Sequence, residues 1–238
     1  MTHLNDICGI QELCFSPLSD TTCAVKGFAE ACADSARTYL MIPETDPEGR
    51  RVVAIEEAAF AGNNELHSVM IPDSVETIGK RAFAFCTSLF EIRVGRYSRL
   101  SYIGDRAFIG CERLATLSLG HLYGNLVCGK KAFAHCTRLR AVALPMGMEE
   151  ISEGMFEGCR MLTLVILPEM LRVVHTAAFS ACVALSEMSL PPSVRRIDDT
   201  AFSFCGKLKA LSLPESECVI SATAFLDCPA MPDFMRAC

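Results

Sequence analysis

The 238-residue sequence contains no tryptophan and no long hydrophobic run. No uncharged apolar stretch approaches the roughly 18 residues that a membrane-spanning helix needs, so we expect no membrane insertion. The N-terminal segment Met1–Asp6 lacks the basic and apolar regions of a signal peptide, which predicts either a cytosolic protein or a chain whose leader is missing. Acidic residues outnumber basic ones and give a net charge of −6, which argues against nucleic acid as the main partner because phosphate binding needs a basic surface.

Sequence motifs for metal binding and catalysis are also absent. The chain has no C-x-x-C pair, and His135 directly precedes Cys136, so their side chains diverge. The segment from Gly124 to Lys130 matches the first part of a phosphate-binding loop, but Lys131 stands where a Ser or Thr is required. The chain also lacks nucleophile-elbow, zinc-protease and dinucleotide-binding motifs. We therefore predict a protein that is not an enzyme and uses no metal or cofactor.

What the sequence does contain is a repeat, and its 51% hydrophobic content excludes a disordered chain. A Phe, preceded by Ala in seven of eight cases, recurs every 23 or 25 residues. An apolar residue lies five positions before each Phe, a Cys or Asn three after it, and a Leu or Met six after it. The repeated Phe residues are Phe60, Phe83, Phe108, Phe133, Phe156, Phe179, Phe202 and Phe225.

The repeat unit is too short for two helices, but it has the length of a leucine-rich repeat with one short strand. The L-x-x-I-x-L segment supplies that strand, and the Pro that often follows ends it because Pro has no N–H for the ladder. Stacking buries the apolar face of each unit against its neighbours. We therefore predict a leucine-rich-repeat solenoid, a curved rod rich in β-structure with short helical turns and a parallel sheet on one face.

Units such as the segment from Ile71 to Leu89 resemble the BspA-type leucine-rich repeat, and the resemblance covers about residues 40–234. The segment before it resembles the leader coil of that family. We expect residues 1–38 to form an N-terminal cap containing a hairpin over Leu13–Val25, which turns near Ser19 and Asp20. Residues 39–238 would hold about eight repeats, the last incomplete, within a single structural domain.

The resemblance implies a non-enzymatic protein-binding module of the adhesin or surface-antigen type, displayed at the cell surface or secreted. Its partner would be a protein of a host or of a neighbouring cell. Two alternatives stay open: an intracellular adaptor or assembly module, which the missing leader favours, and a carbohydrate-binding or enzymatic site on the edge loops.

Seven of the 14 cysteines share one repeat slot, and we interpret them as structural thiols that donate to backbone carbonyls. Asn63 holds the same slot in the first unit and would bond the same groups. Cys128 fills the Ile slot, and Cys14 and Cys23 could face each other across the hairpin, which leaves a disulfide there open. The predicted thiol ladder comprises Cys86, Cys111, Cys136, Cys159, Cys182, Cys205 and Cys228.

Two regions are candidate binding surfaces. The outward positions of two central strands are apolar, and contiguous apolar patches often mark binding sites, although a covering loop would explain them equally well. The two 25-residue units carry extra residues, Tyr and Arg among them, in loops that would lie at one edge of the solenoid. Such loops often form a binding face, but a bulge without function would explain the extra residues as well. The candidates are Ala141, Ala143, Leu164 and Ile166 in the strands, and Arg96, Tyr97, Tyr102 and Tyr123 near the loops.

The end of the chain shows no polar capping unit. Met231 and Phe234 begin another strand pattern, and the sequence then stops at Cys238. The C-terminal coil is therefore predicted to be weakly protected or to be covered by a second copy of the protein.

Overall fold

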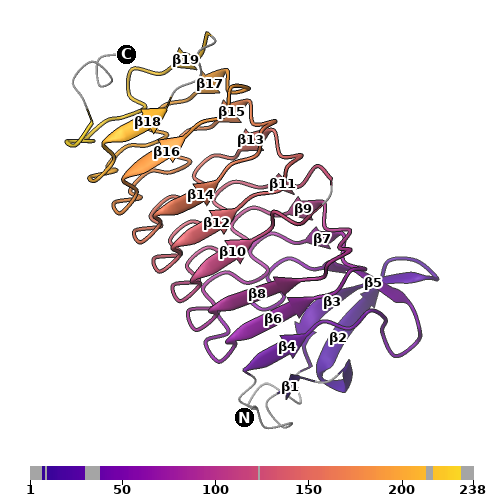
Figure 1. Cartoon of the computed structure of the whole chain (residues 1–238). Coiled ribbons are helices and arrows are strands. Elements are labelled where there is room, and N and C mark those ends of the chain that lie inside the picture. The colour runs from indigo at the N-terminus through magenta and orange to yellow at the C-terminus, as the bar shows by residue number, and fades with distance from the viewer. Residues whose placement is uncertain (1–6, 9, 30–37, 123, 213–216, 232–238) are drawn as a thin grey trace.

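The computed structural model describes residues 7–8, 10–29, 38–122, 124–212 and 217–231. Its coils stack along one axis from the N-terminal to the C-terminal end, and they place strands in two rows on opposite sides of the stack (Figure 1). This architecture confirms the predicted leucine-rich-repeat solenoid. It differs from the prediction of one strand per unit and a sheet on one face, because the repeats also carry a second, shorter strand on the opposite side.

The first strand row contains the strand of the L-x-x-I-x-L segment in each coil. Its strands pair in parallel as β1-β4-β6-β8, β10-β12-β14 and β16-β18. They are β1 (Ile7–Cys8), β4 (Tyr39–Met41), β6 (Ser68–Ile71), β8 (Glu91–Val94), β10 (Thr116–Ser118), β12 (Ala141–Ala143), β14 (Leu164–Ile166), β16 (Glu187–Ser189) and β18 (Ala210–Ser212).

The second strand row contains shorter strands at the Ile slot of each repeat. It pairs as β2-β3-β5-β7-β9-β11 and β13-β15-β17-β19, in parallel except between β2 and β3. Its strands are β2 (Leu13–Pro17), β3 (Thr22–Phe28), β5 (Arg51–Ile55), β7 (Thr77–Ile78), β9 (Tyr102–Ile103), β11 (Val127–Cys128), β13 (Glu150–Ile151), β15 (Val173–Val174), β17 (Arg196–Ile197) and β19 (Val219–Ile220).

The turns around each Ala-Phe pair differ from the short helical turns that the sequence predicts. Within the described residues, the one helical element is the 3-10 turn η2 (Ile10–Glu12). Two residues on either side of Phe83, the backbone is left-handed, with φ of 55° at Arg81 and 59° at Phe85. The N–H groups of Arg81, Phe83 and Phe85 donate to the next coil over 2.9, 2.8 and 2.7 Å. A right-handed helical turn would direct these N–H groups along its own chain instead of toward the neighbouring coil.

A continuous stack of phenylalanine rings runs through the core between the two rows. From Phe60 to Phe225, neighbouring ring centroids lie 5.1 to 5.9 Å apart, with interplanar angles of 1° to 18°. Phe28 of the hairpin packs its ring edge-on against Phe60 at 5.0 Å. Alanines beside the rings, such as Ala82, are fully buried, as expected where backbones of adjacent coils approach closely.

The N-terminal hairpin is formed by β2 and β3, and it turns over residues 18–21, where the sequence places it. The possibility that Cys14 and Cys23 face each other is wrong, because Cys14 pairs with Gly27 and Cys23 pairs with Pro17. Cys14 is exposed, Cys23 is buried, and both thiols are free. A register shift between Cys14 and Phe15 contributes to this pairing.

A loop beside the hairpin is held by the buried carboxylate of Asp46. Its oxygens accept hydrogen bonds from the backbone N–H groups of Glu48 and Arg50 at 3.0 and 2.8 Å, and from Arg50 Nε at 2.7 Å. Burial alone would raise the pKa of Asp46, but the bonds and charge of Arg50 outweigh that effect and hold the pKa below its ordinary value.

Candidate functional site

The seven repeat-slot cysteines form a ladder inside the coils. The Sγ of each donates to the carbonyl of the repeated Phe in the preceding coil, over 2.9 to 3.3 Å. Burial raises the pKa of both Cys86 and Cys136 to about 12. Such protonated, desolvated thiols are poor nucleophiles and poor metal ligands. The ladder is therefore suited to holding coils together rather than to chemistry.

Asn63, in the same slot of the first coil, bonds differently from the cysteines. Its Oδ1 accepts hydrogen bonds from the backbone N–H groups of Glu65 and Leu66 at 3.0 and 2.9 Å. The first Phe carbonyl that a cysteine uses is that of Phe60, which lies in the same coil as Asn63. No repeated Phe of an earlier coil offers a carbonyl to this slot, so an acceptor side chain fits here. The prediction that Asn63 bonds the same groups as the cysteines is wrong.

The described residues contain neither a candidate metal site nor a candidate membrane-spanning helix. In the ranges that the structure describes, no three His, Cys, Asp or Glu side chains gather in a way that could hold a metal ion. The described ranges also contain no helix of the length and apolarity required to span a bilayer.

The outward face of the first strand row carries the central apolar patch, which we define as Ala141, Ala143, Leu164 and Ile166. Pairing of β12 with β14 sets Ala141 beside Leu164 and Ala143 beside Ile166. Leu164 and Ile166 are 54% and 56% exposed. A loop that covered these side chains would bury them, so their exposure excludes that explanation of the pattern.

A second outward region, which the sequence pattern does not single out, lies nearer the N-terminus. Strands β4, β6 and β8 line a hollow of about 440 Å³ with Tyr39, Met41, Met70, Phe90 and Arg93 among its walls. An adjoining hollow of about 400 Å³ shares Met41, Met70 and Arg93. The alternating pattern of β6 and β8 predicts that Met70 and Arg93 face outward. Met41 pairs with Met70 in the structure, but the leader coil lacks the repeat pattern from which this pairing could be predicted.

The predicted edge-loop residues do not form one cluster. Arg96 and Tyr97 follow β8 in the first row, and Tyr97 is 77% exposed. Tyr102 belongs to β9 of the second row, and Tyr123 lies outside the described residues. The loop is nevertheless tightly packed. A Cβ added to Gly95 would collide with Asp73 Oδ1, and that same oxygen accepts the Tyr97 N–H at 3.0 Å.

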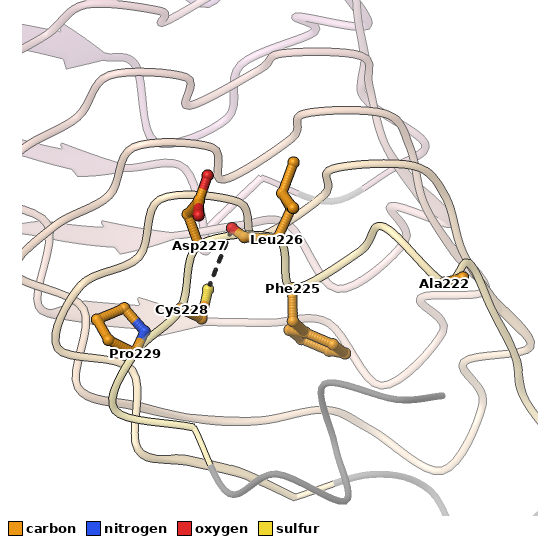
Figure 2. Close-up of a pocket in the computed structure, with 6 residues that line it drawn as sticks. All are labelled: Ala222, Phe225, Leu226, Asp227, Cys228 and Pro229. Carbon is orange, nitrogen blue, oxygen red and sulfur yellow. Dashed lines mark hydrogen bonds between the residues drawn. The ribbon is translucent and has the colours of Figure 1, made fainter.

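The C-terminal end of the stack contains a third hollow, of about 400 Å³, lined by residues of the last described coil (Figure 2). In the preceding coil, Phe202 and Phe204 donate their N–H groups to Ala224 and Leu226, each over 2.8 Å. The equivalent N–H groups of Phe225 and Asp227 have no acceptor among the described residues. Self-association through this coil stays a prediction, and Phe234 and Cys238 lie outside the described residues.

Comparison with known proteins gives matches of sequence and of fold. A structure of a leucine-rich cell surface protein from Faecalibacterium prausnitzii has a TM-score of 0.74 and 30% identity, covering 86% of this chain and 54% of that one. The chain thus spans about half the length of that protein. A leucine-rich repeat protein of T. pallidum shares the fold, with a TM-score of 0.65 and 23% identity over 96% of this chain and 92% of that one.

A leucine-rich repeat protein from Bacteroides ovatus also shares the fold, with a TM-score of 0.63 and 24% identity over 92% of this chain and 68% of that one. No curated protein matches the sequence. The family model of the BspA type leucine-rich repeat region matches residues 53–126 and 124–232, with six copies. The matched ranges cover most of the repeat array, and the chain belongs to the BspA-type leucine-rich repeat family.

Proposed function

We propose that this protein is a non-enzymatic binding module that captures a protein partner on the outward face of its first strand row. The observation that carries the proposal is the exposed pair Leu164 and Ile166 at the centre of that face. The flanking strands β10 and β16 place polar side chains outward there, so the patch is a local departure from the pattern. The F. prausnitzii relative is named a cell surface protein, which supports an adhesin-like role.

The size of the face suits an extended segment of a partner. Strands in a row lie about 4.8 Å apart, so the hollow on β6 and the central patch on β14, four strands further along, are about 20 Å apart. Burying the exposed halves of Leu164 and Ile166 would contribute about 1 to 1.5 kcal/mol each. Tyr97 lies at the edge of the same row and could add an aromatic contact.

The decisive experiment uses two double variants with equal charge change on the same row. Leu164→Glu with Ile166→Glu disrupts the patch, whereas Ser189→Glu with Ser212→Glu alters exposed positions of β16 and β18. Biotinylated parent protein captures surface proteins from candidate cells, and each captured protein is then purified and titrated by calorimetry.

We expect the patch variant to lose at least about tenfold in affinity, with an unchanged far-ultraviolet circular dichroism spectrum, while the serine variant binds like the parent. Equal binding by the patch variant and the parent would contradict the assignment of this face.

A further inference from the structure

Beside the central apolar patch lies a group of arginines, which we call the arginine edge: Arg113, Arg138, Arg140 and Arg160. They occupy the segments that lead into β10, β12 and β14, and all four are exposed. Hydrogen bonds between coils hold these segments together. The Arg138 N–H donates to the Glu112 carbonyl at 3.1 Å, and the Leu164 N–H donates to the Arg140 carbonyl at 3.1 Å.

The four guanidinium groups make no ion pair or side-chain hydrogen bond with the described residues. Two basic side chains of the same coils that lie near the second row are paired, Lys130 at 2.6 Å from Glu153 and Lys131 at 2.9 Å from Glu157. The segments of the arginine edge contain one carboxylate, that of Glu112. A local excess of positive charge therefore exists in a chain whose net charge is −6.

The arginine edge and the apolar patch are continuous along the chain. Arg140 directly precedes Ala141, the first residue of β12, and its carbonyl accepts the N–H of Leu164, the first residue of β14. A ligand that crosses from the edge onto the strands meets positive charge first and aliphatic side chains next. Arginine forms bidentate hydrogen bonds with carboxylates, and it is more weakly hydrated than lysine.

We propose that this composite surface binds an acidic polypeptide segment in which carboxylate side chains adjoin an aliphatic stretch. The proposal rests on the protein-binding function above and names the chemistry of its partner. The aliphatic pair Leu164 and Ile166 favours a polypeptide over a sulfated or phosphorylated polymer, because such a polymer offers no apolar group to cover it. The acidic charge of the rest of the chain would also repel a long polyanion.

The test measures binding of a fluorescein-labelled peptide that carries an acidic block followed by a leucine and valine block, by fluorescence anisotropy. Comparison peptides replace the acidic block with lysines or the aliphatic block with serines, and heparin serves as the polyanion probe. The edge variant is Arg138→Glu with Arg140→Glu. Its matched control is Lys26→Glu with Arg99→Glu, which makes the same charge change at exposed positions outside the patch and the arginine edge.

We expect saturable binding of the acidic–aliphatic peptide, weakened about tenfold or more in the edge variant and by less than about twofold in the control variant. Binding should also weaken as sodium chloride rises from about 50 to about 300 mM, because exposed charges are screened. The lysine peptide should not bind, and the serine peptide should bind at least about tenfold more weakly.

Three results would overturn the proposal. The first is no saturable binding of the acidic–aliphatic peptide, and the second is equally tight binding of the lysine peptide. The third is a serine peptide that binds as tightly as the acidic–aliphatic peptide and is displaced by heparin. If Leu164→Glu with Ile166→Glu abolishes peptide binding while the edge variant retains it, the protein-binding function stands and the acidic preference falls. If neither variant changes binding, both fall.

Discussion

The thiol ladder should make the stability of this protein fall steeply at alkaline pH. Burial is the main or a contributing cause of a raised pKa at six of its members: Cys86, Cys111, Cys136, Cys159, Cys182 and Cys205. At Cys205 the leading cause is a hydrogen bond with the side chain of Cys228, and burial adds to it. The ordinary thiol pKa is 9.0, and for Cys86 and Cys136 the folded value is about 12.

The sign of the effect follows from which state releases protons. Between about pH 9 and pH 12 the unfolded chain ionises its thiols while the folded chain keeps them protonated, so the unfolded state binds fewer protons. The free energy of unfolding is therefore undiminished by these thiols below about pH 9 and decreases as the pH rises further.

The magnitude comes from the number of thiols. At pH 10, one unit above the unfolded pKa, ionisation stabilises the unfolded chain by about 1.4 kcal/mol per thiol, or about 8 kcal/mol for six. At pH 9.5 the same sum is about 5 kcal/mol. Domains are stable by only about 5 to 15 kcal/mol in total, so the protein should lose most of its stability near pH 10.

The assay is urea unfolding followed by far-ultraviolet circular dichroism, with reductant present, at about pH 7.5, 9 and 10. Outside the ladder, burial also raises the pKa of Cys23 to about 11 and that of Cys128 to about 12, so at least eight thiols contribute to the pH slope. The variant Cys136→Ala with Cys182→Ala removes two of these and should reduce the slope by about a quarter. The Phe108 carbonyl stays bonded after this change, because it also accepts the Cys111 N–H at 3.3 Å. Val142→Ala destabilises the buried core while keeping every thiol, so it should leave the slope unchanged. A parent protein with equal urea midpoints at pH 7.5 and 10 would refute the reasoning, and so would an unchanged slope in the cysteine variant.

Three further predictions concern the ring stack, thiol reactivity and the hairpin loop. Phe133→Ala should lower the free energy of unfolding by about 4 kcal/mol, and Phe225→Ala by about 1 kcal/mol less, because among the described residues the Phe225 ring stacks on one neighbour and the Phe133 ring on two. Urea unfolding compares the two variants, and equal losses would argue against a stacking contribution. In the folded protein at about pH 8, iodoacetamide should modify exposed Cys14 and leave buried Cys136 intact, as peptide mapping by mass spectrometry will test. Because the pKa of Asp46 is lowered in the fold, its ionised carboxylate stabilises the folded state above the ordinary carboxyl pKa, and this contribution disappears at lower pH. The melting-temperature difference between the parent and Asp46→Asn should therefore narrow from about pH 6 to about pH 3. A constant difference would contradict this prediction.

The inward-facing residues could be predicted from the sequence because each recurs with the period of the coil. Phe133, Cys136 and Leu139 occupy slots that carry the same or a similar residue in the neighbouring coils, so their burial follows from repetition alone. The left-handed turn positions could not be predicted in this way. Arg81, Phe85 and His135 share that backbone conformation although their side chains have little in common. The requirement falls on the backbone, whose N–H group at each of these positions donates to the next coil.

The non-repeating parts of the chain account for the remaining differences. The pairing of Cys14 with Gly27 follows the register of the hairpin strands, which includes an irregularity that no periodic pattern specifies. The hollow beside Met41 depends on how the leader coil lines up with the first repeats. The apolar pair Leu164 and Ile166 was visible in the sequence because it interrupts a regular alternation, whereas the unpaired state of the neighbouring arginines required the positions of all charged groups.

The contrast between the two strand rows supports the proposal that the first row is the binding surface. Along the second row, charged side chains of successive coils neutralise one another, as in Arg51 with Glu76 and Lys130 with Glu153. The ring of His175 lies 2.9 Å from the Glu150 carboxylate and 3.0 Å from that of Asp198. Such pairing between coils leaves little charge for a partner to bind. Along the first row the described ion pair joins Arg93 and Glu91 within one strand, while the arginine edge stays unpaired beside exposed aliphatic groups. Since the repeat fixes the core of every coil in the same way, partners are distinguished by outward residues that differ between coils. On the first row, the arginine edge and the central apolar patch are such residues, and the described residues leave the four guanidinium groups unpaired.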